Sequence, residues 1–273
     1  MLEATLSTGV TLRYAAQGDP AGVPVVLLHG SSDSHRSYAP MLSHLPHDLR
    51  AYALTTRGHG DSDKPQHGYA LADHVADVAA FLDAVGHDAA VIVGHSFGSY
   101  TAQQFAIDHP ERTVALVLMG AFRAVVRDPE VEALEAAIAA LEDPVDPEFV
   151  RAFQESTITQ PLAPGVLDQA IAESCKLPAR VWRAALDGIL AATPPTEAGL
   201  ITAPTRIVWG DQDAYCPRGE QVLLAAAIPG AELLVYEGTG HAVHWEQPAR
   251  AAADIAAFLS PRGPRRPRPV AVR

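Results

Sequence analysis

A serine flanked by glycines follows a short apolar run near the middle of the sequence. Residues 94–98 read GHSFG, directly after VIV at 91–93 and before a helix-compatible segment. In a G-x-S-x-G motif between a strand and a helix, the serine sits at a strained turn that exposes its hydroxyl, so the positions two before and two after it must be small. Gly94 and Gly98 meet this requirement. We therefore predict that Ser96 is a nucleophile.

Two backbone N–H groups could stabilise the oxyanion that forms when a serine attacks a carbonyl. His29 and Gly30 follow the apolar run at 25–28. In that position the N–H of Ser31 can point to the same place as the N–H of Phe97, the residue after the nucleophile. We predict that Ser31 and Phe97 form an oxyanion hole.

An acid and a histidine that could activate the serine follow the last two apolar runs. Asp213 comes after the run at 205–209 and His241 after the run at 232–236. The chain order Ser, Asp, His is that of triads whose nucleophile lies at a strand-to-helix turn. Asp213 or Asp211 can therefore be the acid, and His241 or His244 the base.

Short apolar runs alternate with segments of helical periodicity over most of the chain. Runs rich in Val, Ile and Leu that are separated by helices are typical of a mainly parallel sheet covered by helices, so the predicted class is α/β. Helical spacing is clear at 71–85, 97–108 and 249–259. The predicted strands are 10–16, 25–28, 51–55, 90–93, 114–119, 205–209 and 232–236.

The alternation stops between residues 122 and 202, where no strand pattern appears. Four helical segments stand there instead, and each opens at a proline, which suits the first turn of a helix. We predict a core of residues 1–121 and 203–260 and an inserted helical cap of residues 122–202. The four segments are 129–141, 147–156, 164–175 and 178–192.

Apolar residues of the cap could form a substrate pocket above Ser96. The predicted substrate-binding residues are Phe122, Phe149, Phe153 and Trp182, and Leu186 could also line the pocket. For each residue taken alone, cap-core packing is the more favoured role. The loop at 32–35 reads SDSH, so a polar contact to the substrate is a further expectation.

These features together resemble the α/β-hydrolase superfamily, in its serine-nucleophile form with a helical cap. The resemblance covers residues 1 to about 260 and implies a mainly parallel eight-stranded sheet. The chain departs from the family at 55–58, where TTRG replaces D-x-R-G, and we expect Arg57 to organise this loop. The landmarks are HG at 29–30, RGHGDS at 57–62, GHSFG at 94–98, GDQD at 210–213 and GHAVHWEQP at 240–248. The match to the last two landmarks implies that Asp213 is the acid and His241 the base, with Asp211 and His244 as the less favoured alternatives.

The nucleophile type restricts the chemistry that this resemblance implies. Dehalogenases and epoxide hydrolases of the superfamily use Asp, whereas Ser96 implies acyl transfer through an acyl-enzyme. We expect hydrolysis of an ester, lactone or related acyl bond of a small, fairly apolar molecule, without metal or cofactor. The alternatives are hydrolysis of a C–C bond in a diketone-like substrate, cofactor-free perhydrolysis with haloperoxidase activity, and a non-catalytic ligand receptor.

The composition argues against three broad classes of protein. The 273 residues are 48% hydrophobic, so the chain can bury a core and is neither disordered nor fibrous. A formal net charge of −12 argues against nucleic-acid binding, which depends mainly on basic residues. We expect a small-molecule substrate as the partner, and either a monomer or a homodimer.

Further expectations come from the termini and the cysteines. No secretion signal or membrane-length apolar run is recognisable, so we expect a cytoplasmic protein without a membrane partner. Cys175 and Cys216 lack metal-ligand spacing, and no metal site is expected. Residues 261–273 hold five arginines and no acid, and we expect this tail to be disordered.

Overall fold

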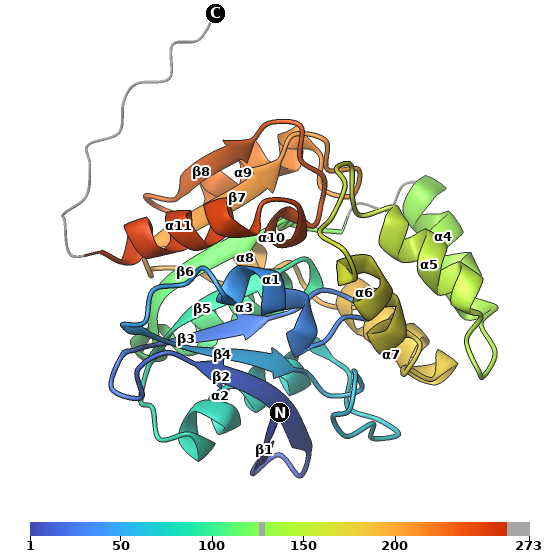
Figure 1. Cartoon of the computed structure of the whole chain (residues 1–273), viewed down its shortest axis with the longest axis horizontal. Coiled ribbons are helices and arrows are strands. Elements are labelled where there is room, and N and C mark those ends of the chain that lie inside the picture. Colours follow the sequence, from blue (N-terminus) through green and yellow to red (C-terminus); the bar gives the residue numbers. More distant parts are fainter. Residues whose placement is uncertain (126–128, 261–273) are drawn as a thin grey trace, which may run out of the picture.

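The centre of the molecule is an eight-stranded sheet with helices on both faces (Figure 1). The computed structural model describes residues 1–125 and 129–260. Its strands are β1 (Leu2–Thr5), β2 (Thr11–Gln17), β3 (Val23–Leu28), β4 (Leu49–Thr55), β5 (Ala90–His95), β6 (Thr113–Met119), β7 (Thr205–Gly210) and β8 (Glu232–Tyr236). They lie in the order β1-β2-β4-β3-β5-β6-β7-β8. The β1-β2 and β2-β4 pairs are antiparallel and the others parallel, which confirms the predicted mainly parallel α/β sheet.

The central strands are buried because their side chains alternate between two hydrophobic layers. In β3, Val26 and Leu28 pack into one layer, whereas Val25 and Leu27 pack into the other. Burial on both faces explains why these strands read as continuous apolar runs. β1 lies at the edge of the sheet with mostly exposed side chains, carries no such run, and was absent from the predicted strands.

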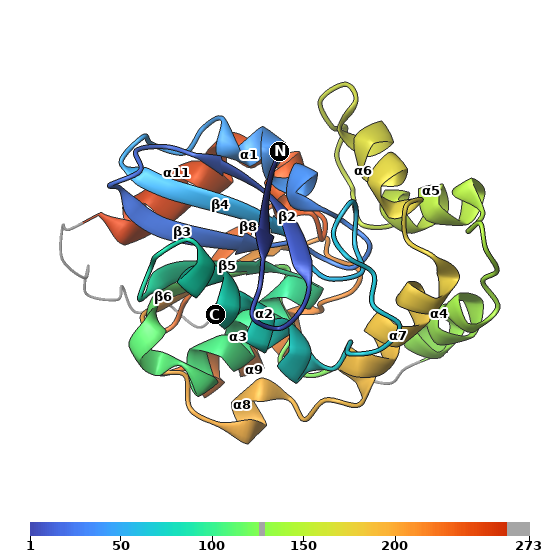
Figure 2. The same ribbon diagram turned by 90° about the horizontal axis from the view of Figure 1, so that it is seen from below.

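Helices cover each hydrophobic layer (Figure 2). One layer packs against α2 (Leu71–Ala84), α3 (Phe97–Asp108) and α9 (Arg218–Ala227). The other packs against α1 (Ala39–Leu42) and α11 (Pro248–Leu259). The remaining short elements are η1 (His35–Tyr38), η2 (Pro110–Arg112) and α10 (Val243–Glu246). Across residues 1–125 and 129–260, no helix is both long and apolar enough to span a membrane.

The chain between β6 and β7 forms helices and, in its described part, no strand. These helices are α4 (Pro129–Ala139), α5 (Pro147–Glu155), α6 (Val166–Ser174), α7 (Ala179–Leu190) and α8 (Pro195–Ala198). Helices α4 to α7 lie together beside the sheet in both views and share a hydrophobic core that includes Val150, Ile171 and Trp182. We propose on this ground that residues 122–202 form a cap on a core of residues 1–121 and 203–260. The predicted tail at 261–273 lies outside the described residues.

The four predicted cap helices correspond to α4 to α7, but their prolines differ in position. Pro147 is the first residue of α5, as expected. α6 begins two residues after Pro164, and α7 begins directly after Pro178. These two prolines therefore precede the first turn rather than form part of it, and α8 is an additional short helix that packs against α3.

Arg57 joins the loop after β4 to α2 through a buried ion pair. Its Nε and Nη2 donate to the two carboxylate oxygens of Asp77 at 2.7 and 2.6 Å. Its Nη1 donates to the carbonyl oxygen of Gly68 at 2.8 Å, so Arg57 organises the loop as predicted. Thr55, which stands where the family pattern has an acid, binds the backbone N–H of His35 through Oγ1 at 3.0 Å.

Replacing Asp77 by Ala should lower the free energy of unfolding by about 3–5 kcal/mol, because it leaves the buried guanidinium of Arg57 without its carboxylate. Urea denaturation measures this change. The control is Asp83→Ala, which removes a pair with Arg112 in which the Asp83 side chain is 68% exposed. That substitution should cost less than about 1 kcal/mol, and equal losses for the two variants would contradict the prediction.

Candidate active site

Ser96 lies at a sharp turn between β5 and α3. Its backbone has φ 51° and ψ −120°, a conformation that costs a non-glycine residue roughly 1–3 kcal/mol. The turn requires both flanking glycines. A Cβ on Gly94 would lie 2.3 Å from the carbonyl oxygen of Gly98, and a Cβ on Gly98 would lie 2.2 Å from that of Leu28. The glycine spacing seen in the sequence is therefore a steric condition of the turn.

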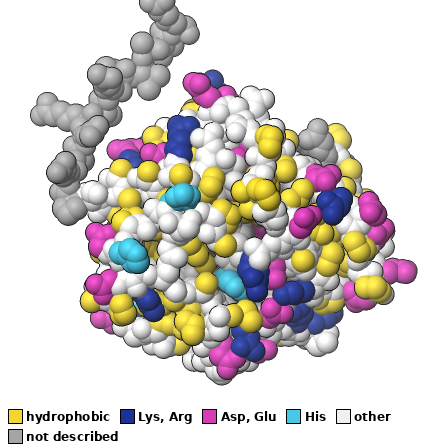
Figure 3. Space-filling view, viewed as in Figure 1, with side chains coloured by type: hydrophobic (Ala, Val, Ile, Leu, Met, Phe, Trp, Pro, Cys, Tyr) yellow, Lys and Arg dark blue, Asp and Glu magenta, His cyan; other side chains and the backbone are white. Residues whose placement is uncertain are grey.

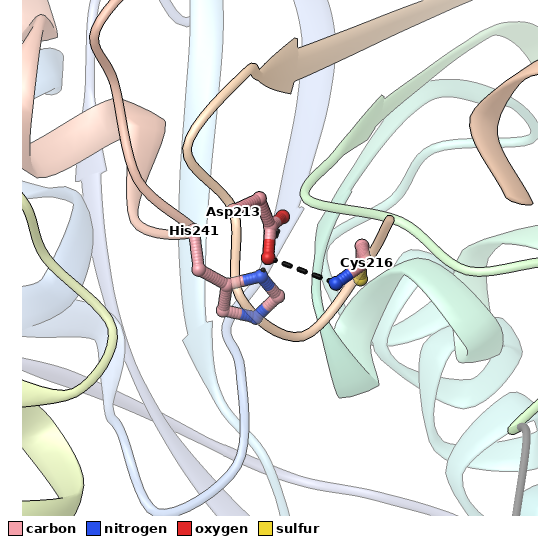
Figure 4. Close-up of side chains that lie close together, drawn as sticks. All are labelled: Asp213, Cys216 and His241. Atoms are coloured by element: carbon pink, nitrogen blue, oxygen red, sulfur yellow. Dashed lines mark hydrogen bonds and ion pairs between the residues drawn. The ribbon is translucent and has the colours of Figure 1, made fainter. Parts of the chain in front are cut away.

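The loops after β7 and β8 bring Asp213 and His241 together (Figure 4). Nδ1 of His241 is 2.9 Å from Oδ2 of Asp213, and both residues are buried. Oδ1 of Asp213 accepts the backbone N–H groups of Tyr215 and Cys216, each at 2.9 Å. Burial alone would raise the pKa of Asp213, but the charge of His241 and these hydrogen bonds lower it below its usual value. An ionised Asp213 fixes the proton of His241 on Nδ1, so that Nε2 carries the lone pair.

His95, the residue before Ser96, contacts the backbone of His241 through a hydrogen bond. His95 is buried, and its Nε2 lies 3.1 Å from the carbonyl oxygen of His241. Burial lowers the pKa of His95 to about 3, so its ring is neutral and Nε2 donates to that oxygen. Gly120 at the end of β6 also packs on His241, since a Cβ there would lie 2.8 Å from the same oxygen.

The alternative base, His244, and the alternative acid, Asp211, each make a hydrogen bond outside the Asp213–His241 pair. His244 is fully buried, and its Nε2 lies 2.8 Å from Oγ of Ser37. Asp211, in the turn that follows β7, is exposed and accepts the backbone N–H of Gly238, in the loop after β8, at 2.7 Å. The geometry therefore favours Asp213 and His241 over these two residues.

Cys216 lies beside the Asp213–His241 pair and completes a group of possible metal ligands. One potential ligand atom from each of the three residues lies within 4.8 Å of the others. Nδ1 of His241 is already bonded to Asp213, however, and Sγ of Cys216 points to the carbonyl oxygen of Gly120 at 3.4 Å. Burial raises the pKa of Cys216 well above its usual value, which keeps it a thiol rather than a metal-binding thiolate. The three residues do not fit a resident metal.

A cavity of about 380 Å³ opens between the core and the cap, and Ser96 and His241 are part of its wall. Ser31 and Phe97, the predicted oxyanion-hole residues, line the same cavity. The N–H of Phe97 opens α3 and has no acceptor within its helix, and the positive end of the helix dipole points the same way. The apolar part of the wall includes Phe122, Val125, Phe153, Leu186, Ile189 and Leu223.

The loop that carries Ser31 packs directly on the nucleophile turn. A Cβ on Gly30 would lie 2.8 Å from Nδ1 of His95 and 3.2 Å from Cβ of Ser96. The next residue but one, Ser32, has φ 62°, the left-handed region that costs a non-glycine residue about 1–2 kcal/mol. Gly30 is thus required for close approach, and the turn after it is strained.

The predicted substrate-binding residues fall into two groups. Phe122 and Phe153 line the cavity. Phe149 and Trp182 are not among its lining residues and pack instead in the hydrophobic core of the cap, with their ring centroids 5.6 Å apart. Trp182 also contacts Phe153 at 5.4 Å and supports it from behind. Their assignment to the pocket is therefore corrected: an aromatic residue on an amphipathic cap helix suits the cap core as well as a pocket.

The polar residues of the cavity wall that were not among the predicted site residues include Gln154 and Asp33. Gln154 comes four residues after Val150, on the buried side of α5, where a polar residue stands out. Asp33 is 4% exposed; its Oδ1 accepts from Nε2 of Gln154 at 3.1 Å and its Oδ2 from Oγ of Ser37 at 3.2 Å. Burial raises the pKa of Asp33 to about 7, against the opposing effects of these hydrogen bonds and of His241. The polar sequence at 32–35 was the only signal of this carboxyl.

Comparison with known proteins identifies the family of the chain. A family model described as the alpha/beta hydrolase fold matches residues 23–248, and the chain therefore belongs to that family. It is 30% identical to a 2-hydroxymuconate semialdehyde hydrolase of Pseudomonas sp. over 88% of each chain. An esterase of Rhodococcus has a TM-score of 0.83 at 26% identity and covers 96% of this chain and 99% of its own. An esterase from Exiguobacterium antarcticum has a TM-score of 0.84 at 21% identity, with 94% and 98% covered.

Replacing Asp33 by Asn should stabilise the protein more at about pH 8 than at about pH 5. The folded protein keeps the Asp33 proton up to a pKa of about 7, whereas the unfolded chain loses it near 3.8, so stability falls as the pH rises between these values. Asn keeps the shape and never ionises. The gain in the free energy of unfolding should be larger at the higher pH by on the order of 2 kcal/mol, measured by urea denaturation. A gain that is independent of pH would show that Asp33 ionises normally.

Proposed function

We propose that the protein is a serine hydrolase that cleaves an ester, lactone or related acyl bond of a small, fairly apolar molecule. One observation carries this proposal: Ser96, in a strained turn at the start of α3, shares the wall of an apolar cavity with His241, which is bonded to Asp213. Family membership and the esterase neighbours support a hydrolase. A cavity of about 380 Å³ suits a small molecule.

In this proposal the reaction proceeds through an acyl-enzyme. Nε2 of His241 removes the proton of Ser96, and Oγ of Ser96 attacks the substrate carbonyl. The N–H groups of Ser31 and Phe97 stabilise the oxyanion, and Asp213 stabilises the imidazolium of His241. His241 then protonates the leaving group, and water, activated in the same way, releases the acid and restores Ser96.

A C–C bond hydrolase is the second candidate, because one relative at 30% identity is named as a 2-hydroxymuconate semialdehyde hydrolase. Such a reaction would use the same cavity on a ketone instead of an ester. Comparison of kcat/KM for short-chain esters, lactones and vinylogous diketones separates the two candidates. Turnover of diketones at least ~10²-fold faster than that of every ester would favour C–C hydrolysis, a difference of about 2.7 kcal/mol in transition-state stabilisation.

Ser96→Ala should abolish labelling by a fluorophosphonate probe and lower kcat on p-nitrophenyl acetate by at least ~10³-fold, because the nucleophile is lost. Intact-mass analysis should show one adduct on the parent and none on the variant. The control is Ser43→Ala, at an exposed serine outside the cap, which should behave like the parent. An unlabelled parent would exclude an activated serine, and with it the perhydrolase alternative, and would favour a receptor role.

Ile189→Trp should shorten the acyl chain that the enzyme accepts, because Ile189 lines the cavity from α7 and is buried. We expect kcat/KM for p-nitrophenyl hexanoate to fall at least ~10-fold more than that for the acetate, which is about 1.4 kcal/mol of discrimination. Leu200→Trp, at a residue that is 60% exposed, is the control and should leave the ratio unchanged. Equal losses for both esters would mean that the acyl group lies elsewhere.

A further inference from the structure

A buried polar contact connects the cap to the loop that carries Ser31. Nε2 of Gln154, on α5, lies 2.8 Å from Oγ of Ser174, 3.1 Å from Oδ1 of Asp33 and 3.2 Å from Oγ of Ser32. Oγ of Ser174, at the end of α6, lies 3.0 Å from the carbonyl oxygen of Ser32. Gln154, Ser174 and Ser32 are each at most 2% exposed. The cap residues are more than 120 positions away from the loop in sequence.

Ser32 is the residue of this loop that most needs external support. The turn from Gly30 to Asp33 is closed by a long hydrogen bond of 3.4 Å, from the N–H of Asp33 to the carbonyl oxygen of Gly30. Ser32 stands at its third position with φ 62°, where glycine is normally preferred. Ser31, the second residue of the turn, carries the N–H of the proposed oxyanion hole. A change in the Ser32 conformation would rotate the peptide planes beside that N–H.

We propose that Gln154 and Ser174 are positioning residues of the oxyanion hole. They hold Ser32 in its left-handed conformation and thereby aim the N–H of Ser31 at the carbonyl oxygen bound next to Ser96. This inference rests on the proposed acyl transfer. It makes the cap a contributor to transition-state stabilisation as well as a cover for the substrate.

The position of Ser174 is itself fixed by charged contacts between α6 and the core. Nε of Arg36 lies 3.3 Å from Oε1 of Glu173, the residue before Ser174. Nζ of Lys176 lies 2.9 Å from Oδ2 of Asp61 and 2.8 Å from Oε1 of Glu173. Basic and acidic side chains gather in this region of the surface (Figure 3). The hydroxyl of Ser174 is therefore held at the loop even though the cap is a separate set of helices.

Two substitutions test the role of the contact. Ser174→Ala removes the hydroxyl, and Gln154→Met keeps the side-chain length but removes the donor. With active sites counted by fluorophosphonate titration, we expect kcat to fall about 10-fold while KM changes less than about 3-fold, since the lost interaction acts mainly in the transition state. The affinity for a boronic acid that forms a tetrahedral adduct on the serine should fall in parallel with kcat. Gln169→Ala, at a cap glutamine outside this contact, should match the parent.

A Ser32→Gly background distinguishes a positioning role of Ser174 from a general structural role. In a Ser32→Gly background the left-handed conformation needs little support, so Ser174→Ala should lower kcat at least ~3-fold less than it does in the parent. The proposal would be overturned if Ser174→Ala lowered kcat equally in both backgrounds. It would also be overturned if kcat per labelled site were unchanged in both Ser174→Ala and Gln154→Met. An unlabelled parent would overturn the proposed function together with it, whereas a labelled and active parent with unaffected variants would overturn this inference alone.

Discussion

The close approach of β5, α3 and β3 at Gly94 and Gly98 is the constraint on which the rest of the site depends. Any side chain at either position would collide with a backbone carbonyl at little more than 2 Å. The absence of both Cβ atoms lets the chain reverse at Ser96, places the start of α3 beside the serine, and brings the loop after β3 against the same turn. The strain at Ser96 is supported by a buried sheet whose central strands pack on both faces, so the rigid core holds a conformation that a short peptide would not keep.

Two buried carboxyl groups near His241 have opposite electrostatic environments. Asp213 receives two backbone N–H groups and the imidazole, and its pKa is lowered. Asp33 is as deeply buried but has a side-chain amide and a hydroxyl as its partners, and its pKa is raised to about 7. Burial is therefore not decisive by itself; the number and charge of the donors determine which carboxylate is a permanent anion at neutral pH.

The sequence was sufficient to predict those elements and site residues whose local pattern has a physical cause. Strands buried on both faces appear as apolar runs, and the serine turn appears as a pair of glycines at fixed spacing. The edge strand β1 has neither signature, because its side chains are mostly exposed. The sequence could not separate the two roles considered for Phe149 and Trp182, since cap core and pocket select the same residue types. Gln154 and Ser174 were beyond reach for another reason: their partner, Ser32, is close to them only after the cap has folded onto the core.

The cap has a hydrophobic cluster formed mainly by residues of α4 to α7, into which Tyr69 of the core also packs. Among the described residues no strand contributes to this cluster, so substitutions inside it can leave the packing of the sheet unchanged. Such independence favours rapid divergence of substrate preference within a fixed catalytic frame. Gln154 and Ser174 set the limit of that freedom, because they are the cap positions whose hydrogen bonds reach the strained loop of the core. A population of natural variants should consequently be varied across the cap and restricted at these two positions.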